Sequence, residues 1–306
     1  MIERITDGAY LVNTDTTPYI KFDKFDGLDW MNAGFSTRYG GVSKGCFESM
    51  SLSFGRGDPD ENIIENFRLL GRSAGFDTEQ IVLPNQQHTT EVRVASFGVA
   101  SLGVVPWGRG QGFISTRPDY PADGQVTNEP GTVLIVYGAD CVPVYLCDPV
   151  NKAVGACHAG WKGTLGNIPQ KTVELMQKSF GSRPEDIIAV IGPSICMDCY
   201  EVSADVAEQF IERFEAEGIS CEESELIKRV GISAKKDNNY AAAGRDSEKY
   251  LLNLWAINRQ NLIMSGLLAE NIDISGVCTK CHPDMLFSHR AHGDKRGTNA
   301  GFIFIR

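Results

Sequence analysis

Hydrophobic and polar positions along the chain follow two periods, one typical of strands and one typical of helices. Runs rich in β-branched and aromatic residues predict strands over 142–147, 153–157, 186–193 and 301–305. Apolar positions three or four residues apart, with a capping residue before them and glycine after them, predict helices. These helices are expected over 59–74, 170–180, 203–217 and, with Asp246 or Ser247 as the cap, up to Gly266.

A hairpin is predicted from the two strands that flank Asp148-Pro149-Val150-Asn151. Aspartate followed by proline fits a type I turn centred between Pro149 and Val150. In an antiparallel pair folded about that point, Cys141 and His158 lie directly opposite each other. Their Cβ atoms would be about 4.5–5.5 Å apart, near enough for a thiolate and an imidazole to share one zinc ion. The alternative is a buried cysteine beside a packed histidine, since cysteine is among the residues most often buried.

His88 is a candidate for a third ligand. It lies in a polar cluster between two short apolar runs, with Asn85 and Gln87 close to it in the sequence. This pattern predicts a strand end or bulge, where the amide side chains could orient the imidazole or a substrate. A histidine that is simply hydrogen-bonded is an equally good interpretation of His88.

Size and composition exclude several classes of protein. With 306 residues and 42% hydrophobic content, the chain is expected to form a packed core in one large domain or two small ones. The charged N-terminal segment and the absence of an 18-residue apolar run disfavour secretion and membrane spanning, so we expect a cytoplasmic protein. A net charge of −10 disfavours nucleic acid as a partner, and five histidines are too few for several copper centres.

The nine cysteines are expected to be reduced thiols in the cytosol. Two pairs, Cys196/Cys199 and Cys278/Cys281, have the C-x-x-C spacing that lets two sulfur atoms reach one tetrahedral ion. The distance between the pairs in the sequence is far greater than in ribbon-type zinc sites. We therefore expect thiols that line the core or a pocket, with a shared structural zinc site as the alternative.

Arginines in two segments are candidates for anion binding. Arg38 precedes Gly40-Gly41, where the backbone can approach a ligand closely. The segment 286–298 is the most basic part of this acidic chain. If this segment folds back on the hairpin, Arg290 and Arg296 could supply the positive field that phosphate requires. The alternative for both segments is a solvated loop.

Six motifs stand out in chain order: FSTR at 35–38, QH at 87–88, DCVP at 140–143, HAGWKGT at 158–164, GP at 192–193 with CYEV at 199–202, and FSHR at 287–290. Together they resemble the laccase-domain family, once described as multicopper polyphenol oxidases. The better-supported activity of this family is on purine nucleosides, and the family includes the peptidoglycan editing factor. The resemblance extends from about residue 30 to the C-terminus. It implies an α/β fold in a single domain over 1–306, with a mixed β-sheet core and helices packed outside.

The same resemblance implies a metal centre. His88, Cys141 and His158 correspond to the metal-binding triad of the family, which usually holds zinc, with copper as the alternative. Two imidazoles and a thiolate leave one zinc position open, where a bound water has its pKa lowered toward about 7. The implied activity is phosphorolysis of adenosine, inosine or methylthioadenosine, together with deamination of adenosine.

The substrate contacts follow by analogy and stay predictions. Arg38 would hold phosphate, and Asp140 would orient or deprotonate a bound group. Other substrate contacts are expected from Asn85, Gln87, Lys162 and Arg290. The chain departs from the family at His289-Arg290-Ala291, where a Tyr-Arg-Arg pattern is common, so the role of Arg290 is the least supported.

Three other functions stay open at this point. Some family members suggest editing of cell-wall precursors, in which a wrongly added amino acid is removed from UDP-muramoyl-L-serine. A copper-dependent phenol oxidase and a non-catalytic zinc or redox module built on the two C-x-x-C pairs are the others. The expected partners are a purine nucleoside and phosphate, and no oligomeric state is predicted.

Overall fold

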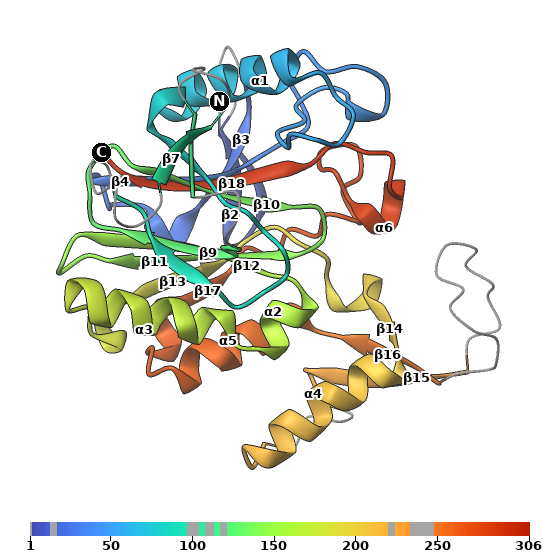
Figure 1. The fold of residues 1–306 in the computed structure, drawn as a ribbon. Helices are drawn as coiled ribbons and strands as arrows, with labels where there is room; N and C mark the ends of the chain where they lie inside the picture. The colour runs from blue at the N-terminus through green and yellow to red at the C-terminus, as the bar shows by residue number, and fades with distance from the viewer. Residues whose placement is uncertain are drawn as a thin grey trace.

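Two large β-sheets pack face to face, and helices cover their outer faces (Figure 1). The computed structural model describes residues 2–12, 17–96, 104–107, 113–116, 121–219, 224–232 and 248–306. Within these ranges no helix is both long enough and apolar enough to cross a membrane.

The first sheet has nine strands and is mixed. Its pairs are antiparallel except where β5 pairs with β10 and with β8. In spatial order its strands are β1 (Ile2–Thr6), β2 (Ala9–Val12), β3 (Tyr19–Phe22), β4 (Met31–Ser36), β18 (Asn299–Ile305), β10 (Val133–Gly138), β5 (Ile81–Leu83), β8 (Phe113–Thr116) and β7 (Val104–Trp107).

The second sheet has six strands and is also mixed, because its two outermost pairs are parallel. Its order is β17 (Ile272–Ile274), β13 (Ile188–Ile191), β11 (Val142–Asp148), β12 (Ala153–Ala159), β9 (Gly124–Thr127) and β6 (Val92–Val94). A small antiparallel sheet contains β14 (Glu201–Ser203), β16 (Glu248–Leu252) and β15 (Ile227–Ile232). The predicted α/β class with mixed sheets is confirmed.

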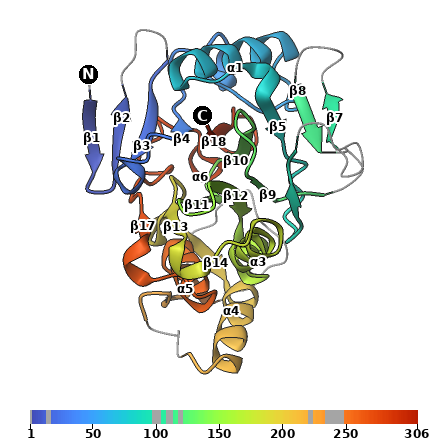
Figure 2. The same cartoon turned by 90° about the vertical axis from the view of Figure 1, so that its left-hand side faces the viewer.

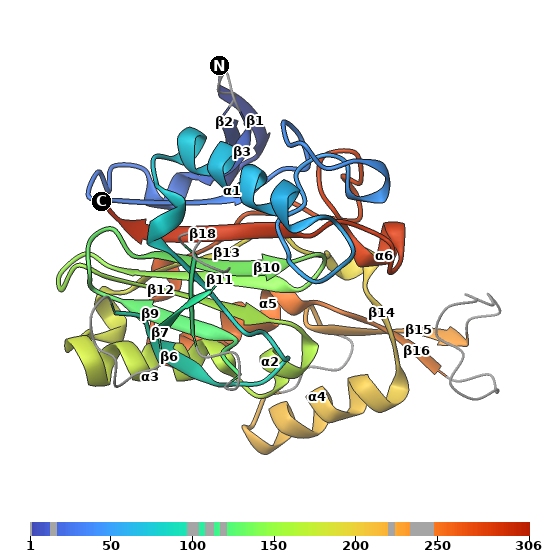
Figure 3. The ribbon, with the colours of Figure 1, turned by 45° about the horizontal axis from the view of Figure 1, so that its top comes forward.

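The helices form the outer layers. Helix α1 covers the nine-stranded sheet, whereas α3 and α5 cover the six-stranded sheet (Figure 2). Helix α4 packs against the small sheet (Figure 3). Their bounds are α1 (Asp60–Ala74), α2 (Trp161–Leu165), α3 (Ile168–Phe180), α4 (Ala204–Ala216), α5 (Leu254–Met264) and α6 (His289–His292).

Strand β11 contributes to two separate parts of the core. Tyr145 packs with Phe35 and Ile303 between the two large sheets. Val144 and Leu146, on the other face of the strand, belong to the cluster beneath the helices. A strand that is buried on both faces reads as a continuous hydrophobic run, which explains the sequence of β11.

Three of the four predicted helices are confirmed to within a few residues as α1, α3 and α4. The fourth was wrong at its start. Tyr250 and Leu251 lie in β16, which pairs with both β14 and β15, and Asp246 and Ser247 lie outside the described residues. The helix begins only after Asn253, whose side-chain oxygen accepts a hydrogen bond from the Ala256 amide at 3.2 Å.

The predicted hairpin is present, but its register differs from the prediction by two residues. His158 opposes Pro143, whereas the prediction placed it opposite Cys141. A shift by an even number leaves each side chain on its expected face of the sheet. Cys141 and His158 are therefore still close, across the end of the strand pair.

The loop of the hairpin explains the difference in register. It contains four residues, Pro149 to Lys152, because Asp148 pairs with Ala153. The Asp148 Oδ1 accepts hydrogen bonds from the backbone amides of the second and third loop residues at 2.9 Å and 3.0 Å. Lys152 then adopts φ 52°, in the left-handed region. The prediction did not include this residue in the loop.

Candidate metal centre

Three potential metal ligands converge from separate elements of the chain. His88 lies in the loop between β5 and β6, Cys141 in the turn between β10 and β11, and His158 in β12. One ring nitrogen from each histidine and the Cys141 Sγ all lie within 4.8 Å of one another. His158 is buried, Cys141 is half-buried and His88 is exposed, so the cluster opens to solvent on the His88 side.

A buried carboxylate that the sequence did not reveal organises this cluster. The Asp123 Oδ1 accepts hydrogen bonds from His158 Nδ1 at 2.9 Å and from the His88 backbone amide at 3.0 Å. Its Oδ2 accepts from the backbone amides of Gln87 at 3.0 Å and Thr89 at 2.9 Å. With its Nδ1 proton donated to Asp123, His158 presents Nε2 as the metal ligand, the arrangement found around many zinc sites.

Interactions within the cluster favour the ionised forms of Asp123 and Cys141. Burial by itself would raise the pKa of Asp123, but its hydrogen bonds with His158 and with the backbone of Thr89 and Gln87 lower that pKa to about 2. Burial likewise opposes ionisation of Cys141, yet the charge and hydrogen bond of His158 and the hydrogen bond of His88 lower the pKa of the thiol to about 6. At neutral pH Cys141 is therefore a thiolate, the form that binds metal.

The same interactions raise the pKa of His158, because they favour its protonated form. Burial would lower its pKa, but the Cys141 charge and the hydrogen bonds to Asp123 and Cys141 raise the pKa to about 9. In the metal-free site the pair is thus a thiolate and an imidazolium. A metal ion must displace the second ring proton of His158 when it binds.

The space at the cluster fits a metal ion. A Cβ atom built on Gly160 would lie 3.1 Å from Cys141 Sγ, 3.1 Å from His88 Cδ2 and 3.6 Å from His158 Cε1. Because glycine has no side chain, the three ligands can approach one another here. Two imidazoles and a thiolate are donors that zinc and copper both accept.

Asp140 precedes the cysteine ligand and is held by three distant segments. Its Oδ1 accepts a hydrogen bond from Thr279 Oγ1, and its Oδ2 accepts one from the Arg290 backbone amide, each at 2.6 Å. Its carbonyl oxygen accepts a hydrogen bond from the Ile195 amide at 3.0 Å. These contacts hold Asp140 at φ 94°, which few residues other than glycine adopt. The basic C-terminal segment therefore does fold back on the turn before the hairpin.

The predicted arginines occupy different environments. Arg38 donates hydrogen bonds to the carbonyl oxygens of Glu48 at 3.0 Å and Pro283 at 2.8 Å, and its guanidinium lies 4.6 Å from the centre of the Phe287 ring. The Arg290 guanidinium donates to the Glu201 carbonyl oxygen at 3.1 Å and 3.2 Å. Both guanidinium groups thus take part in contacts between segments that are distant in the sequence.

Arg296 is the buried arginine of the C-terminal segment. Only 7% of it is exposed, and its Nη1 donates to the Gly297 carbonyl oxygen at 2.9 Å. Its Nε is buried without a hydrogen-bond partner among the described residues. Burial and the charge of Arg56 lower its pKa, whereas the charges of Asp140 and Cys141 act in the opposite direction. The Arg296 guanidinium is thus buried within reach of the charges of the metal cluster.

The other predicted contact residues lie around the loop of His88 and on α2. The side chains of Gln87 and Asn85 are joined by a hydrogen bond of 3.3 Å, and Lys162 is exposed on α2. The neighbouring Gln86, which the sequence did not single out, anchors this loop. Its side-chain amide exchanges two hydrogen bonds with the backbone of Tyr137, at 3.0 Å and 2.7 Å.

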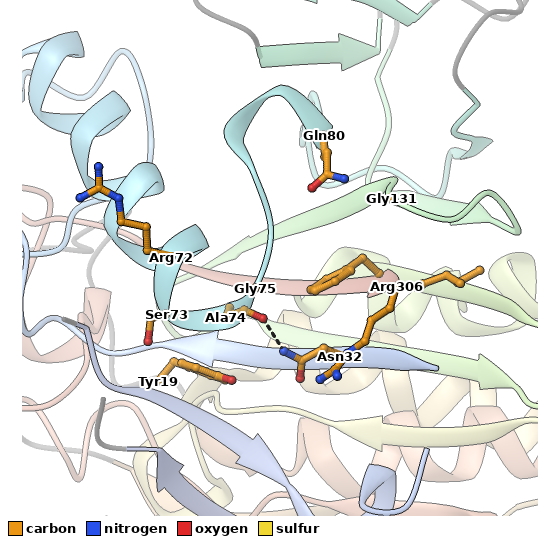
Figure 4. Close-up of a pocket in the computed structure, with 11 residues that line it drawn as sticks. Tyr19, Asn32, Arg72, Ser73, Ala74, Gly75, Gln80, Gly131 and Arg306 are labelled. Carbon is orange, nitrogen blue, oxygen red and sulfur yellow. Dashed lines mark hydrogen bonds between the residues drawn. The ribbon is translucent and has the colours of Figure 1, made fainter. Parts of the chain in front are cut away.

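A hollow of about 490 Å³ lies elsewhere, where α1 ends near β4 and the C-terminal end of β18 (Figure 4). Arg72 and Arg306 contribute to its wall, and the Asn32 side chain donates to the Ala74 carbonyl oxygen at 2.8 Å beside it. None of the predicted site residues lines this hollow.

The two C-x-x-C pairs lie together in the fold, contrary to the main expectation from their spacing. The sulfur atoms of Cys196, Cys199, Cys278 and Cys281 are all within 4.8 Å of one another. Sequence distance misled here because β13 and β17 pair in parallel, and the segments that follow them run side by side.

The chain is similar to several curated proteins, among them two bacterial proteins that it matches over most of their length. It is 34% identical over 275 residues to a Bacillus subtilis protein named purine nucleoside phosphorylase YlmD, covering 90% of this chain and 88% of that one. It is 32% identical over 270 residues to a Bacteroides thetaiotaomicron protein named purine nucleoside phosphorylase, covering 88% and 90%.

The fold of this chain is also similar to solved structures of proteins with related names. The YlmD protein from Geobacillus stearothermophilus superposes with a TM-score of 0.76 at 28% identity, covering 97% of this chain and 98% of that one. The Bacillus licheniformis protein YfiH superposes with the same TM-score and identity, covering 96% and 98%. The family model described as multi-copper polyphenol oxidoreductase laccase matches residues 32–306. The chain belongs to that family.

Proposed function

We propose that this protein is a zinc-dependent purine nucleoside phosphorylase. The names of its relatives support the reaction class. The observation that carries the proposal to this chain is the cluster of His88, Cys141 and His158, whose potential ligand atoms all lie within 4.8 Å of one another. A metal cluster within electrostatic reach of a buried guanidinium, that of Arg296, is suited to a reaction that brings phosphate to a nucleoside.

His88, Cys141 and His158 would hold the zinc ion. When bound, zinc supplies a Lewis acid with one open position and lowers the pKa of a bound water toward about 7. Asp123 fixes the orientation of the His158 ring and of the loop that carries His88. Copper accepts the same donors, so the choice of zinc is part of the proposal.

In phosphorolysis a phosphate oxygen bonds to C1′ of the ribose while the bond from C1′ to N9 of the purine breaks. The purine leaves with the electron pair of that bond and takes up a proton. Arg296 would hold the phosphate with its guanidinium, and Arg38 would add a second positive charge. Asp140, whose carboxylate oxygens each already accept one hydrogen bond, would accept another from the bound substrate.

Recognition of the nucleoside would come from the exposed side of the cluster. Asn85 and Gln87 lie on the loop of His88, and Lys162 follows the ligand strand β12 by three residues. We propose that these side chains and Arg290 contact the base and sugar. Deamination of adenosine belongs to the same proposal, with water replacing the amino group at C6 and ammonia leaving.

A product assay tests this function. Zinc-loaded protein is incubated with inosine or adenosine, with and without phosphate, and base and ribose 1-phosphate are quantified. We expect both products only when phosphate is present. Loss of one hydrogen bond to a charged group costs about 1.5–3 kcal/mol, so Arg296→Gln should raise the KM for phosphate by about 10-fold or more.

The matched control is Arg68→Gln, because Arg68 is exposed on α1. It should leave the KM for phosphate unchanged. The proposal is wrong if wild-type protein releases no base under conditions where a known phosphorylase does. If the protein as purified holds copper and no zinc, the assignment of the metal is wrong.

A further inference from the structure

The two C-x-x-C pairs form a four-sulfur cluster that the proposed reaction does not use. All four sulfur atoms lie within 4.8 Å of one another, and the Sγ atoms of Cys199 and Cys281 are 3.6 Å apart. In a tetrahedral zinc site with Zn–S bonds of about 2.3 Å, neighbouring sulfur atoms are about 3.8 Å apart. The cluster therefore has nearly the dimensions of a four-thiolate zinc site.

Each pair lies on a tight turn of the kind that presents two sulfur atoms to one ion. The Cys199 amide donates to the Cys196 carbonyl oxygen at 3.1 Å, and the His282 amide donates to the Cys278 carbonyl oxygen at 3.2 Å. The Cys196 amide also donates to the Cys278 sulfur of the other pair at 3.3 Å. Backbone N–H groups aimed at sulfur stabilise thiolate ligands around a metal.

The backbone brings the two turns into register. Ser194 and Cys278 form a parallel bridge. The Ser194 amide donates to the Val277 carbonyl oxygen, and the Thr279 amide donates to the Ser194 carbonyl oxygen, each at 3.1 Å. The second C-x-x-C turn begins at the bridged Cys278 and the first begins two residues after the bridged Ser194, which is why residues so distant in sequence meet.

We propose that Cys196, Cys199, Cys278 and Cys281 bind a second zinc ion, which has a structural role. Binding replaces four S–H bonds by four Zn–S bonds and releases four protons, with no oxidation or reduction. A site with four protein ligands has no open position, so it holds the chain together and carries out no reaction.

This second site would act on the first through Asp140. Ile195, which donates to the Asp140 carbonyl oxygen, directly precedes Cys196. Thr279, which donates to the Asp140 carboxylate, directly follows Cys278. A zinc ion that joins the two turns would fix both donors, and with them the strained turn that carries Cys141. The four cysteines are therefore positioning residues in this proposal.

Metal stoichiometry tests the proposal independently of nucleoside chemistry. Protein purified with a reductant and loaded with zinc should contain two zinc ions per chain. Cys141→Ser should contain one, and X-ray absorption should show that this ion has only sulfur neighbours, at about 2.3 Å. The double substitution Cys199→Ser/Cys281→Ser should also contain one ion, now with nitrogen neighbours. Cys46→Ser is the control, because Cys46 is an exposed cysteine outside both clusters, and should keep two.

Other results would overturn the proposal. One zinc ion in the wild type, lost on Cys141→Ser, would mean that the cysteine cluster binds none. Iron with acid-labile sulfide would identify a different cofactor, and a disulfide between Cys199 and Cys281 in reduced preparations would identify a redox pair. If a variant fails to fold, X-ray absorption of the wild type still decides, because a four-thiolate site raises the number of sulfur neighbours per zinc ion above the one that Cys141 supplies. A failed phosphorolysis assay would leave this proposal unaffected, because the four sulfur atoms alone carry it.

Discussion

At the scale of single residues, the geometry of the metal cluster depends on Asp123. This one carboxylate accepts hydrogen bonds from the His158 ring and from three consecutive amides at 87–89. No pattern in the sequence indicated this role, because Asp123 lies 35 residues from His158 in an irregular segment and matches no motif. Side chains that orient ligands are harder to predict than the ligands, since many residue types and positions can supply the hydrogen bond.

Replacing this carboxylate by an amide should weaken the metal site. Asp123→Asn removes the negative charge and places an NH₂ group against groups that donate hydrogen bonds. Loss of such a partner typically lowers metal affinity about 10-fold to 100-fold, and we expect a change of that size in zinc titrations with a competing chelator. Asp60→Asn, at an exposed position in the first turn of α1, should leave the affinity unchanged. Equal affinities for the two variants would contradict this role of Asp123.

The thiol of Cys141 should react in a pH-dependent way in metal-free protein. Its pKa is about 6, below the ordinary value, so the thiolate predominates at pH 7 and is lost as the pH falls through about 6. The rate of alkylation by iodoacetamide, followed at Cys141 by peptide mass spectrometry, should show that midpoint. His158→Gln removes the cation that favours the thiolate, so the midpoint should move to higher pH. An unchanged midpoint would show that His158 does not control the thiol.

At the scale of elements, the sequence predicted local structure better than the way elements meet. Helix α1 followed from Pro59, its apolar stripe and Gly75, all of which are local, although Asp58 makes no capping hydrogen bond to the helix backbone. The register of the hairpin could not be predicted from local signals, because it depends on the left-handed conformation of Lys152. The predicted start of α5 was also wrong, since the pairing of β16 with two other strands overrides the helical pattern around Tyr250. The closeness of Cys141 and His158 followed from the predicted hairpin, whereas the approach of His88 to this pair became visible only in the fold.

The junction between β12 and α2 gives a sharp test of the cluster. Gly160 has φ −64°, which alanine adopts without strain, so Gly160→Ala should fold normally. Its new methyl group would lie 3.1 Å from both Cys141 Sγ and His88 Cδ2 and would push the ligands apart. We expect loss of one zinc ion per chain with an unchanged circular dichroism spectrum. Full zinc content in this variant would argue against a metal ion between these ligands.

At the scale of the whole molecule, the layer under α1 is a scaffold separate from the chemistry. Phe67 is fully buried between α1 and the outer face of the nine-stranded sheet, in a cluster with Leu70 and Phe302. The metal ligands come from loops and strands at the other large sheet and at the junction with it. Stability and metal binding should therefore respond to different substitutions.

Phe67→Ala should test this separation. Truncating a buried phenylalanine costs about 3–5 kcal/mol, which urea denaturation should detect as a lower free energy of unfolding. The folded variant should keep its full zinc content. Val150→Ala, in the hairpin loop where Val150 is 66% exposed, should change stability by less than about 0.5 kcal/mol. A loss of zinc from folded Phe67→Ala protein would show that the layers are coupled.

An anomalous difference map at the zinc edge, from crystals of the zinc-loaded protein, is the sharpest test of the proposed metal centre. We expect a peak bounded by His88, Cys141 and His158, about 2.3 Å from the Cys141 sulfur and about 2.0–2.1 Å from one nitrogen of each ring. A map with no peak between these three side chains would contradict the metal centre, and with it the proposed mechanism.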